Sequence, residues 1–375
     1  MSLNHSELLR YGRHLSLDDF GEAQQERLKD AKILIVGCGG LGCPCALYLA
    51  AVGVGQLGII DDDNVEASNL HRQILFSEAD IRKSKVEVAV RKLKEQNQHI
   101  QVKGIKARLT TENAIELIEQ YDIVIDGTDN FPTRYLVNDA CVILDKVNIH
   151  GSISQFEGQV SVFNYKHENG ERGPNYRDVY PEPPNVSMVP DCATGGVLGV
   201  LPGIIGTIQA TEAIKVVTGI GKPLSGTIFL FDALDMSTRR LKIRKNKSIN
   251  IKELINYDEF CGIKVNNANQ MKEITVQELK QMKDEGKDFQ LIDVREQHEF
   301  DLCNLGGDLI PLNTVMDDPD KISKDKPVVV HCRSGARSAN AIMALSERYG
   351  YDNLSNLKGG ILAWSQEIDP SVPQY

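Results

Sequence analysis

Apolar residues in the first part of the chain form short continuous runs separated by longer amphipathic segments. Runs at Ile33–Val36, Gly58–Ile60 and Ile123–Ile125 have the length and aliphatic content of buried strands. Between them, apolar residues recur at helical spacing at Val86, Ala89, Val90 and Leu93. Alternation of this kind predicts an α/β fold with a doubly wound, Rossmann-like parallel sheet.

The pattern changes in the middle of the chain. Residues Asn164–Pro190 are rich in Gly, Pro, Asn and charge, and irregular segments of this length inside a domain usually carry function or move. Regular structure is expected to return with a helix over Gly206–Val217 and a strand near Ile228–Phe231. A polar stretch over residues 246–270 then predicts a flexible linker.

The C-terminal segment repeats the alternation on a smaller scale. Apolar runs at Leu291–Ile292 and Val328–Val330 predict strands, and the patterns at Val276–Leu279 and Ala339–Leu345 predict helices. We therefore expect three parts, which are an α/β domain over residues 1–245, the linker over 246–270 and a smaller α/β domain over 271–375.

Composition narrows the possible functions. The chain has 375 residues, 41% of them hydrophobic and 25% charged, and its net charge is −10. An acidic protein lacks the positive field that nucleic-acid phosphates require, so we expect no direct nucleic-acid partner. The basic run over residues 239–245 indicates either contact with an acidic protein or, as we favour, a solvated strand end.

Cysteine usage and hydropathy indicate the compartment. The eight cysteines show no paired framework of the kind found in small secreted domains. The N-terminal residues contain no hydrophobic signal core. The apolar stretch Gly195–Ile208 is too short and too glycine-rich to span a bilayer. We expect a cytoplasmic protein with reduced thiols and no membrane partner.

The first predicted strand leads directly into a glycine motif. Gly37, Gly39 and Gly42 match G-x-G-x-x-G between a strand and a helix, where backbone amides and the helix dipole can hold phosphate. Asp61 ends the next strand, where a carboxylate can accept ribose hydroxyls. By itself this arrangement suits NAD at least as well as ATP.

Polar residues after Asp61 favour ATP. Arg72 and Lys85 supply cations that hydride transfer does not need but that stabilise a leaving pyrophosphate. Asp129 follows a strand end and can hold Mg²⁺. Each residue has a simpler interpretation, with the cations as surface charges and Asp129 as a helix N-cap. The combination makes that interpretation less convincing.

Five segments then occur in the order and spacing of a known family. They are RYGRHL from Arg10, GCGGLG from Gly37, DDDNVEASNLHRQ from Asp61, KSKVE from Lys83 and DGTDN from Asp126. Together they resemble the adenylating domain of the MoeB/ThiF family, the bacterial relatives of ubiquitin-activating enzymes, from about Glu7 to Lys245.

The resemblance implies roles for particular residues. Arg13 would reach the site of a second subunit, which implies a homodimer, and Asp129 would bind magnesium. Beside the three motif glycines, the implied ATP-binding residues are Gly40, Asp61, Asp63, Ser68, Asn69, Arg72, Lys85, Asp129 and Asn130.

The resemblance also concerns a cysteine and a metal. Cys192 stands where the family places a cysteine that could form a thioester or acyl disulfide, although free cysteines are commonly buried and structural. Relatives usually bind zinc through two CxxC pairs. Here Pro174–Asp178 stands at the first pair, and residues 244–252 contain no cysteine. We therefore expect no zinc.

A second chemical motif lies in the C-terminal domain. Cys332 is followed by Arg333, Ser334, Gly335, Ala336 and Arg337, between a buried strand and a helix. Backbone amides, a helix dipole and nearby arginines can stabilise a thiolate or a persulfide anion there.

The region from Lys272 to Trp364 resembles a single rhodanese domain. Arg337 lies five positions after Cys332, whereas related phosphatases have a loop longer by one residue. The shorter loop favours sulfur transfer over phosphatase activity. Asp293 and Arg295 are expected to brace the loop, and His331 is expected to be structural.

Together the two domains predict an adenylyltransferase and sulfurtransferase. The expected substrate is the C-terminal glycine of a small ubiquitin-fold sulfur carrier ending in Gly-Gly. Arg72, Lys85 and the partner's Arg13 would assist adenylation. A persulfide on Cys332, charged by a persulfide donor and resolved by Cys192 or another thiol, would then yield a thiocarboxylate. Molybdopterin, thiamine and tRNA-thiolation pathways use such products, and we favour the first.

Three alternatives remain. An NAD-dependent oxidoreductase would explain the glycine motif. A dehydratase that adenylates a modified tRNA base would share the first domain, but not the acidic charge or the sulfur domain. A carrier-docking protein without activity would need degraded site residues, and these are intact in the sequence.

Overall fold

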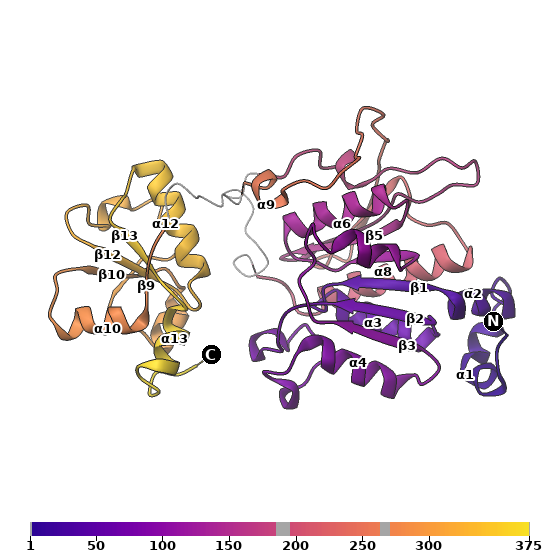
Figure 1. Ribbon diagram of the computed structural model, residues 1–375, viewed down its shortest axis with the longest axis horizontal. Coiled ribbons are helices and arrows are strands. Elements are labelled where there is room, and N and C mark those ends of the chain that lie inside the picture. Colours follow the sequence, from indigo (N-terminus) through magenta and orange to yellow (C-terminus); the bar gives the residue numbers. More distant parts are fainter. Residues whose placement is uncertain (1, 185–195, 263–270, 375) are drawn as a thin grey trace. The chain divides into compact units, whose positions relative to one another are not determined.

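The computed structural model describes residues 2–184, 196–262 and 271–374 (Figure 1). The chain forms two compact units, one within residues 1–264 and the other within residues 265–375. Each unit has a sheet of its own. Within the described ranges, no helix combines the length and the apolar character that crossing a bilayer requires.

The first unit is built on an eight-stranded sheet. Its strands are β1 (Lys32–Val36), β2 (Gln56–Ile60), β3 (Gln101–Ile105), β4 (Ile123–Asp126), β5 (Val147–Ser154), β6 (Glu157–Phe163), β7 (Thr227–Asp232) and β8 (Thr238–Lys242). Their order across the sheet is β3-β2-β1-β4-β5-β6-β7-β8. β1 to β5 are parallel, whereas β6, β7 and β8 pair antiparallel. The central strands β1, β2 and β4 are largely continuous apolar runs because both of their faces are covered.

Helices cover the two faces of this sheet. The α-helices are α1 (His5–Leu15), α2 (Glu22–Asp30), α3 (Gly42–Val52), α4 (Lys85–Gln96), α5 (Ala114–Glu119), α6 (Phe131–Ile143), α8 (Leu201–Thr218) and α9 (Tyr257–Phe260). Short 3₁₀ helices are η1 (Ala67–Asn69), η2 (Glu78–Asp80) and η3 (Tyr176–Asp178). One core contains residues of α2, α3, α4 and α8, and a second contains residues of α5, α6 and α9. Figure 1 shows α6 and α3 on opposite sides of the sheet.

The predicted Rossmann-like α/β fold is confirmed. The strand expected near Ile228–Phe231 is β7, whereas the sequence pattern did not reveal β6, β8 or the antiparallel pairing. Helix α8 also begins earlier than predicted, at Leu201. Pro202 and Gly203 resemble helix breakers in the sequence. Pro202 lies in the first turn, where a missing backbone N–H costs no helical hydrogen bond.

Three segments of the first unit meet at the buried carboxylate of Asp139 on α6. Arg177, in η3, donates from Nε over 2.9 and 3.2 Å and from Nη2 over 2.7 Å. The Tyr257 hydroxyl on α9 donates to the same carboxylate over 2.8 Å. The Arg177 guanidinium also lies over the rings of Tyr135 and Phe260. These contacts attach the irregular segment around η3 to the sheet domain.

The Asp139 cluster concerns two expectations from the sequence. Helix α9 lies within residues 246–270, which we expect to be linker, and its Tyr257 is buried in the core of the first unit. Arg177 lies within Pro174–Asp178, where the family resemblance places a zinc-binding cysteine pair. In this chain an ion pair and aromatic rings hold that segment. The absence of zinc stays a prediction.

The second unit contains a five-stranded parallel sheet in the order β11-β10-β12-β13-β9. Its strands are β9 (Lys272–Ile274), β10 (Gln290–Asp293), β11 (Asp308–Leu309), β12 (Val328–His331) and β13 (Leu354–Leu357). Its helices are α10 (Val276–Asp284), α11 (Gln297–Leu302), η4 (Pro319–Lys321), α12 (Ala336–Tyr349) and α13 (Gly360–Glu367). One core contains residues of α12, and the other joins α10 to α13.

His331, the last residue of β12, is fully buried. Its Nε2 lies 3.7 Å from Oδ2 of Asp293, and neither ring nitrogen has a hydrogen-bond partner within the described part of the chain. Burial lowers the pKa of His331 to about 4, although the Asp293 charge opposes this effect. The imidazole is therefore neutral at physiological pH. It stays neutral well below pH 6.5, near which an ordinary histidine titrates.

We expect Asp139→Asn to lower the free energy of unfolding of the first unit by about 3 kcal/mol, because it leaves a largely buried guanidinium without a counter-charge. Glu259→Gln removes an exposed carboxylate on α9 and serves as the control, with a change of less than about 0.5 kcal/mol. Urea unfolding followed by circular dichroism measures both. Elemental analysis should find no zinc, and EDTA should leave the wild-type midpoint unchanged. A midpoint for Asp139→Asn equal to wild type would contradict this role of the cluster.

The second unit should lose stability as the pH falls from about 6.5 to about 4, because only its unfolded state takes up the His331 proton in this window. Above that window both states are neutral at this residue. Trp364 is the single tryptophan and is buried on α13, so its fluorescence reports the unfolding of this unit in the full chain.

His331→Phe should flatten this part of the stability profile. His298→Gln, at an exposed position on α11, should leave the profile unchanged. An equally steep acid dependence in His331→Phe would show that another group is responsible.

Candidate active sites

The glycine motif forms a tight turn between β1 and α3. Gly37 has a φ of +89°, a conformation that favours glycine. A Cβ on Gly42 would lie 2.0 Å from the Gly37 carbonyl oxygen. The Cys38 N–H donates to Oδ2 of Asp61 over 2.7 Å, which joins the turn to the end of β2. Asp61 thus supports the turn as well as lining the site beside it.

A cleft of about 370 Å³ lies beside this turn. It is bounded by the carboxyl ends of β1, β2 and β4, as expected for an open α/β sheet. Of the predicted binding residues, those that line it are Gly37, Gly39, Gly40, Asp61, Asp63, Arg72, Lys85, Asp129 and Asn130. Gly42, Ser68 and Asn69 are not among the lining residues.

Two cations are fixed at this cleft. Arg72 donates from Nη2 to Oδ1 of Asn69 over 2.6 Å and from Nη1 to the Ser68 carbonyl over 3.4 Å. Ser68 and Asn69 therefore orient the guanidinium. The ammonium of Lys85, whose side chain is buried, lies 2.7 Å from Oδ2 of Asp63.

The charges around Lys85 affect one another. Burial alone would lower the pKa of Lys85, but the charge of Asp61 and the bond to Asp63 raise it. Burial raises the pKa of Asp61 despite the nearby Lys85 charge. Lys85 consequently stays protonated, and the cleft keeps a fixed positive group for an anionic ligand.

Asp129 and Asn130 differ in their roles. The Asn130 side chain accepts the Thr133 N–H over 3.0 Å and caps α6. The helix N-cap is therefore Asn130 and not Asp129. Asp129 is exposed at the cleft, where an oxygen ligand for a hard cation is available. Across the cleft, carboxylate oxygens of Asp61, Asp62 and Asp63 lie within 4.8 Å of one another.

Arg134 is a cleft residue that sequence reasoning missed. It lies in the first turn of α6 with 8% of its surface exposed, and its Nη2 donates to the Thr128 carbonyl over 3.2 Å. The neighbouring Asp126 carboxylate is fully buried and accepts from Thr128 Oγ1 over 2.6 Å. It also contacts Nδ1 of His150 over 2.9 Å. A basic residue one turn after the Asp-Asn pair was the available sequence signal.

Two predicted site residues, Arg13 and Cys192, are not placed at this cleft by the structure. Arg13 is exposed on α1 and does not line the cleft of its own chain. Its role across a dimer stays a prediction. Cys192 lies outside the described residues. Cys38 is buried against the glycine turn, and a hydrogen bond with Cys43 together with burial raises its pKa.

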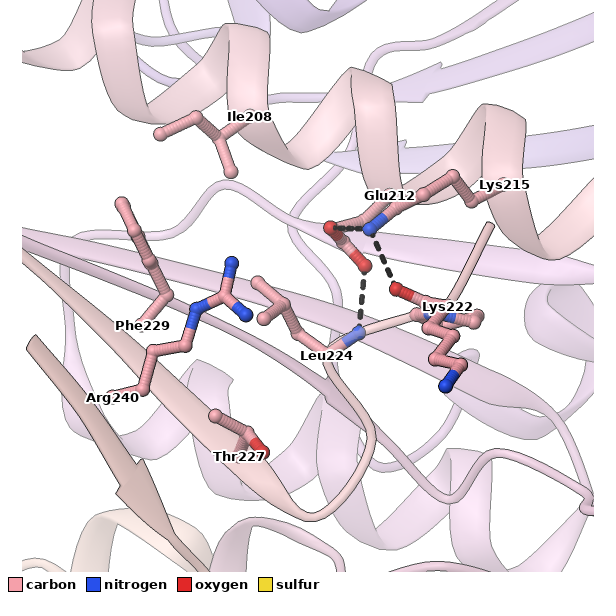
Figure 2. Close-up of a pocket in the computed structure, with 9 residues that line it drawn as sticks. Ile208, Glu212, Lys215, Lys222, Leu224, Thr227, Phe229 and Arg240 are labelled. Atoms are coloured by element: carbon pink, nitrogen blue, oxygen red, sulfur yellow. Dashed lines mark hydrogen bonds and ion pairs between the residues drawn. The ribbon is translucent and has the colours of Figure 1, made fainter. Parts of the chain in front are cut away.

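A second cleft of similar volume lies along α8, β7 and β8 (Figure 2). There Glu212 accepts the Leu224 N–H over 2.8 Å and pairs with Lys215. Lys215 also donates to the Lys222 carbonyl over 2.9 Å. The cleft contains none of the predicted site residues, and its buried carboxylate is already satisfied.

The sulfur loop of the second unit encloses Cys332. The Cys332 Sγ is fully buried and lies 3.2 Å from the Gly335 N–H and 3.5 Å from the Ser338 hydroxyl. The single hydroxyl proton of Ser338 is shared between this sulfur and Oδ1 of Asn356, which lies closer, at 2.7 Å. Gly335 adopts a φ of +97°. The loop thus surrounds a sulfur with donors and can hold an anionic sulfur species.

The first turn of α13 holds the outer side of this loop. The Ile361 and Leu362 N–H groups donate to the carbonyls of Cys332 and Arg333 over 2.9 and 3.1 Å. A Cβ on Gly360 would lie 2.4 Å from the Cys332 carbonyl oxygen. The GGILAW segment therefore fixes the loop carbonyls on the outside.

Comparison with protein families identifies both units. A model described as the ThiF family matches residues 11–251. The chain belongs to the ThiF family. Its C-terminal unit carries a rhodanese-like domain, matched over residues 275–367.

Relatives of this ThiF-family chain share both parts. It is 44% identical over 381 residues to the probable adenylyltransferase/sulfurtransferase MoeZ of Mycobacterium tuberculosis, covering 100% of this chain and 97% of that protein. It is 39% identical over 398 residues to the adenylyltransferase and sulfurtransferase MOCS3 of Aedes aegypti, covering 100% and 90%. The prediction of an adenylyltransferase and sulfurtransferase enzyme is confirmed at this level.

Solved structures support the ThiF-type fold. E. coli MccB, in a crystal structure with ATP, has a TM-score of 0.55 and 23% identity, covering 66% of this chain and 75% of that chain. This likeness concerns the fold alone.

We expect Gly42→Ala to lower the unfolding temperature of the ThiF-type unit, because its Cβ overlaps the Gly37 carbonyl oxygen. Gly39→Ala lies in the same loop but meets only Gln73 Nε2 at 3.8 Å, so it should unfold near the wild-type temperature. Thermal circular dichroism compares the two variants. Equal unfolding temperatures would show that the close approach at Gly42 does not determine the stability of this unit.

Proposed function

We propose that this enzyme uses ATP to adenylate the C-terminal glycine of a small ubiquitin-fold carrier ending in Gly-Gly and then converts it to a thiocarboxylate. The observation that supports this most is the presence in one chain of two complementary sites. One is a cleft with fixed cations beside a glycine turn, and the other is a thiol enclosed by donors.

The ThiF-type cleft supplies binding and charge neutralisation for the first step. The carrier carboxylate attacks the α-phosphate of ATP, and pyrophosphate leaves. Arg72 and Lys85 line the cleft and would stabilise the leaving charge, and no nucleophile from the protein is needed. Asp129, with Asn130 beside it, would hold Mg²⁺, which supplies further charge neutralisation on the phosphates.

NAD is a less suitable ligand than ATP for the residues of this cleft. A nicotinamide cofactor would use the glycine turn and Asp61, but it would leave the fixed Arg72 and Lys85 charges without a developing anion to stabilise. ATP uses all of these groups.

Cys332 supplies the second step. Its thiolate attacks the outer sulfur of a persulfide donor, the donor's sulfur–sulfur bond breaks, and the donor thiolate leaves. The terminal sulfur of the resulting persulfide then attacks the acyl adenylate, and AMP leaves. A thiol, from Cys192 or from another molecule, attacks the Cys332 sulfur of the acyl disulfide, so that the carrier leaves as its thiocarboxylate and a disulfide remains on the enzyme.

The cellular setting follows from the same chemistry. We favour molybdopterin synthesis as the pathway that uses the thiocarboxylate, and a reducing cytoplasm as the place where the free thiol persists. A homodimer would bring Arg13 of each chain to its partner's cleft. Zinc is not part of the proposal.

Cys332→Ser should leave carrier adenylation intact and abolish thiocarboxylate formation, because only the second step uses this sulfur. Cys303→Ser changes another thiol of the same unit and should behave as wild type.

Lys85→Met should reduce ATP–pyrophosphate exchange by about 10²–10³-fold, as expected for loss of a charge that stabilises the transition state.

Intact-mass spectrometry of the carrier, with Mg-ATP and a sulfur donor, measures the product as the replacement of one oxygen by sulfur. A wild-type enzyme that shows neither exchange nor this mass change with any candidate carrier would refute the proposed function. Loss of adenylation in Cys332→Ser would refute the assignment of separate steps to the two sites.

A further inference from the structure

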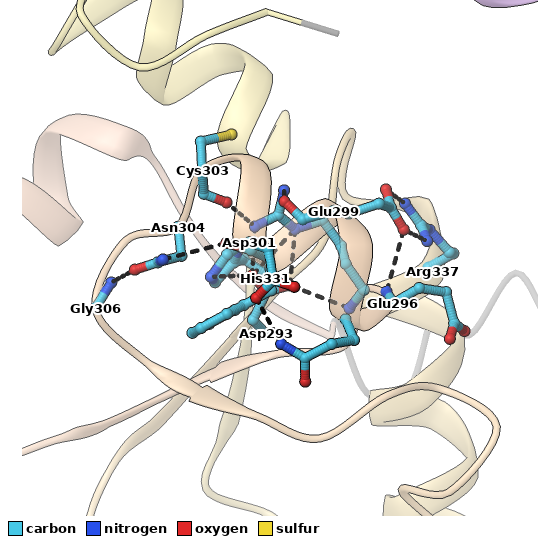
Figure 3. Close-up of polar contacts among 12 residues, drawn as sticks. Asp293, Glu296, Glu299, Asp301, Cys303, Asn304, Gly306, His331 and Arg337 are labelled. Atoms are coloured by element: carbon cyan, nitrogen blue, oxygen red, sulfur yellow. Dashed lines mark hydrogen bonds and ion pairs between the residues drawn. The ribbon is translucent and has the colours of Figure 1, made fainter.

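The sulfur loop ends in an arginine that is held by a carboxylate from another helix. Arg337 Nη1 and Nη2 donate to the two carboxylate oxygens of Glu299, on α11, each over 2.6 Å. The Arg337 side chain is 22% exposed and that of Glu299 is 10% exposed. Figure 3 shows the two side chains facing one another. This bidentate geometry is the strongest form of arginine–carboxylate pairing.

Glu299 is itself fixed by the structure around it. Its Oε2 accepts the Glu296 N–H over 3.1 Å, and its backbone carbonyl accepts from Arg295 Nη1 over 3.3 Å. Arg295 is fully buried and bonds both oxygens of Asp293 over 2.6–3.0 Å. Arg295 also donates to the Cys303 carbonyl over 2.7 Å (Figure 3). Because it is fixed in this way, Glu299 meets Arg337 with little further loss of side-chain freedom.

Arg337 belongs to the loop that encloses the sulfur. Arg337 directly precedes Ser338, whose hydroxyl is 3.5 Å from Cys332 Sγ. A guanidinium at this place would attract an anionic sulfur donor, and it would attract a dianion about twice as strongly in energy as a monoanion. Glu299 cancels that charge and occupies both terminal nitrogens of the guanidinium.

We propose that Glu299 is a positioning residue that selects the sulfur donor. By engaging Arg337, it weakens the binding of a doubly charged donor such as thiosulfate relative to a singly charged one. This inference rests on the proposed sulfur transfer at Cys332. In the charging step, the Cys332 thiolate attacks the sulfane sulfur of thiosulfate, a sulfur–sulfur bond forms, and sulfite leaves with the electron pair of the broken bond.

The alternative is a purely structural clamp between α11 and α12. In that case, loss of the pair would loosen the loop and reduce turnover with every donor alike. Donor charge separates the two interpretations, because methanethiosulfonate transfers the same kind of sulfur atom but carries a single negative charge and releases methanesulfinate.

The test is sulfur transfer to cyanide by the full chain with Glu299→Gln, using thiosulfate or methanethiosulfonate as the donor. We expect KM for thiosulfate to fall about fivefold and KM for methanethiosulfonate about twofold, with kcat within about twofold of wild type. The difference between donors should shrink as salt is added, since screening weakens partly exposed charges.

Three further variants test whether the change in KM comes from the charge of Glu299 and acts through Arg337. Asp301→Asn removes another carboxylate from α11 and should leave both KM values unchanged. Glu299→Asp keeps the charge and should retain the wild-type donor preference. Glu299→Gln combined with Arg337→Gln should lose the gain in thiosulfate affinity, because the gain acts through the freed guanidinium.

Equal changes for both donors, or a gain that persists in the double variant, would overturn the inference. Should Glu299→Gln fail to fold by Trp364 fluorescence, Arg337→Gln gives the complementary test. It removes the cation that faces Glu299 and should raise KM for thiosulfate more than for methanethiosulfonate. A wild-type chain inactive with both donors would instead refute the proposed sulfur transfer itself.

Discussion

Both sites depend on a close backbone approach at a glycine that opens a helix, where no side chain would fit. In the ThiF-type unit, the Gly42 Cα lies so close to the Gly37 carbonyl that a Cβ would overlap it. In the rhodanese-like unit, Gly360 approaches the Cys332 carbonyl in the same way, from the first turn of α13. The Gly335 N–H lies at the Cys332 sulfur, and the glycine turn leads into the N-terminus of α3, where free amides can hold a ligand's negative charge.

The two sites differ in how far their cations are neutralised. In the ThiF-type cleft, Arg72 bonds the neutral amide of Asn69, and Lys85 pairs with Asp63, whose side chain is 67% exposed and therefore strongly screened by water. In the sulfur loop, Arg337 pairs with Glu299, whose side chain is only 10% exposed, and the sulfur itself faces the Gly335 N–H. In the proposed reaction a leaving pyrophosphate carries more negative charge than a single sulfur anion. The less neutralised cations thus belong to the site of the larger charge.

The sequence predicted those elements that short runs of neighbouring residues determine. The parallel strands, the glycine turn and the Cys332 loop all follow from runs of neighbouring residues. The strands β6 and β8 did not. Every residue of β8 is exposed, so β8 shows no apolar run, and β6 pairs with β7 from a distant part of the chain. Glu299 and Arg337 are separated by 38 positions, and Arg134 joins the cleft through a contact with the Thr128 backbone. Such contacts become apparent only once the helices are placed on their sheet.

The Asp139 cluster has a consequence for how this chain can diverge from its relatives. Its charged and aromatic members come from α6, η3 and α9, and each makes its contacts with members from the other segments. An ancestor that acquired Asp139 before Arg177 would have carried an uncompensated buried charge. Replacement of one member therefore selects for replacement of the others, so these three segments are expected to have changed together during evolution.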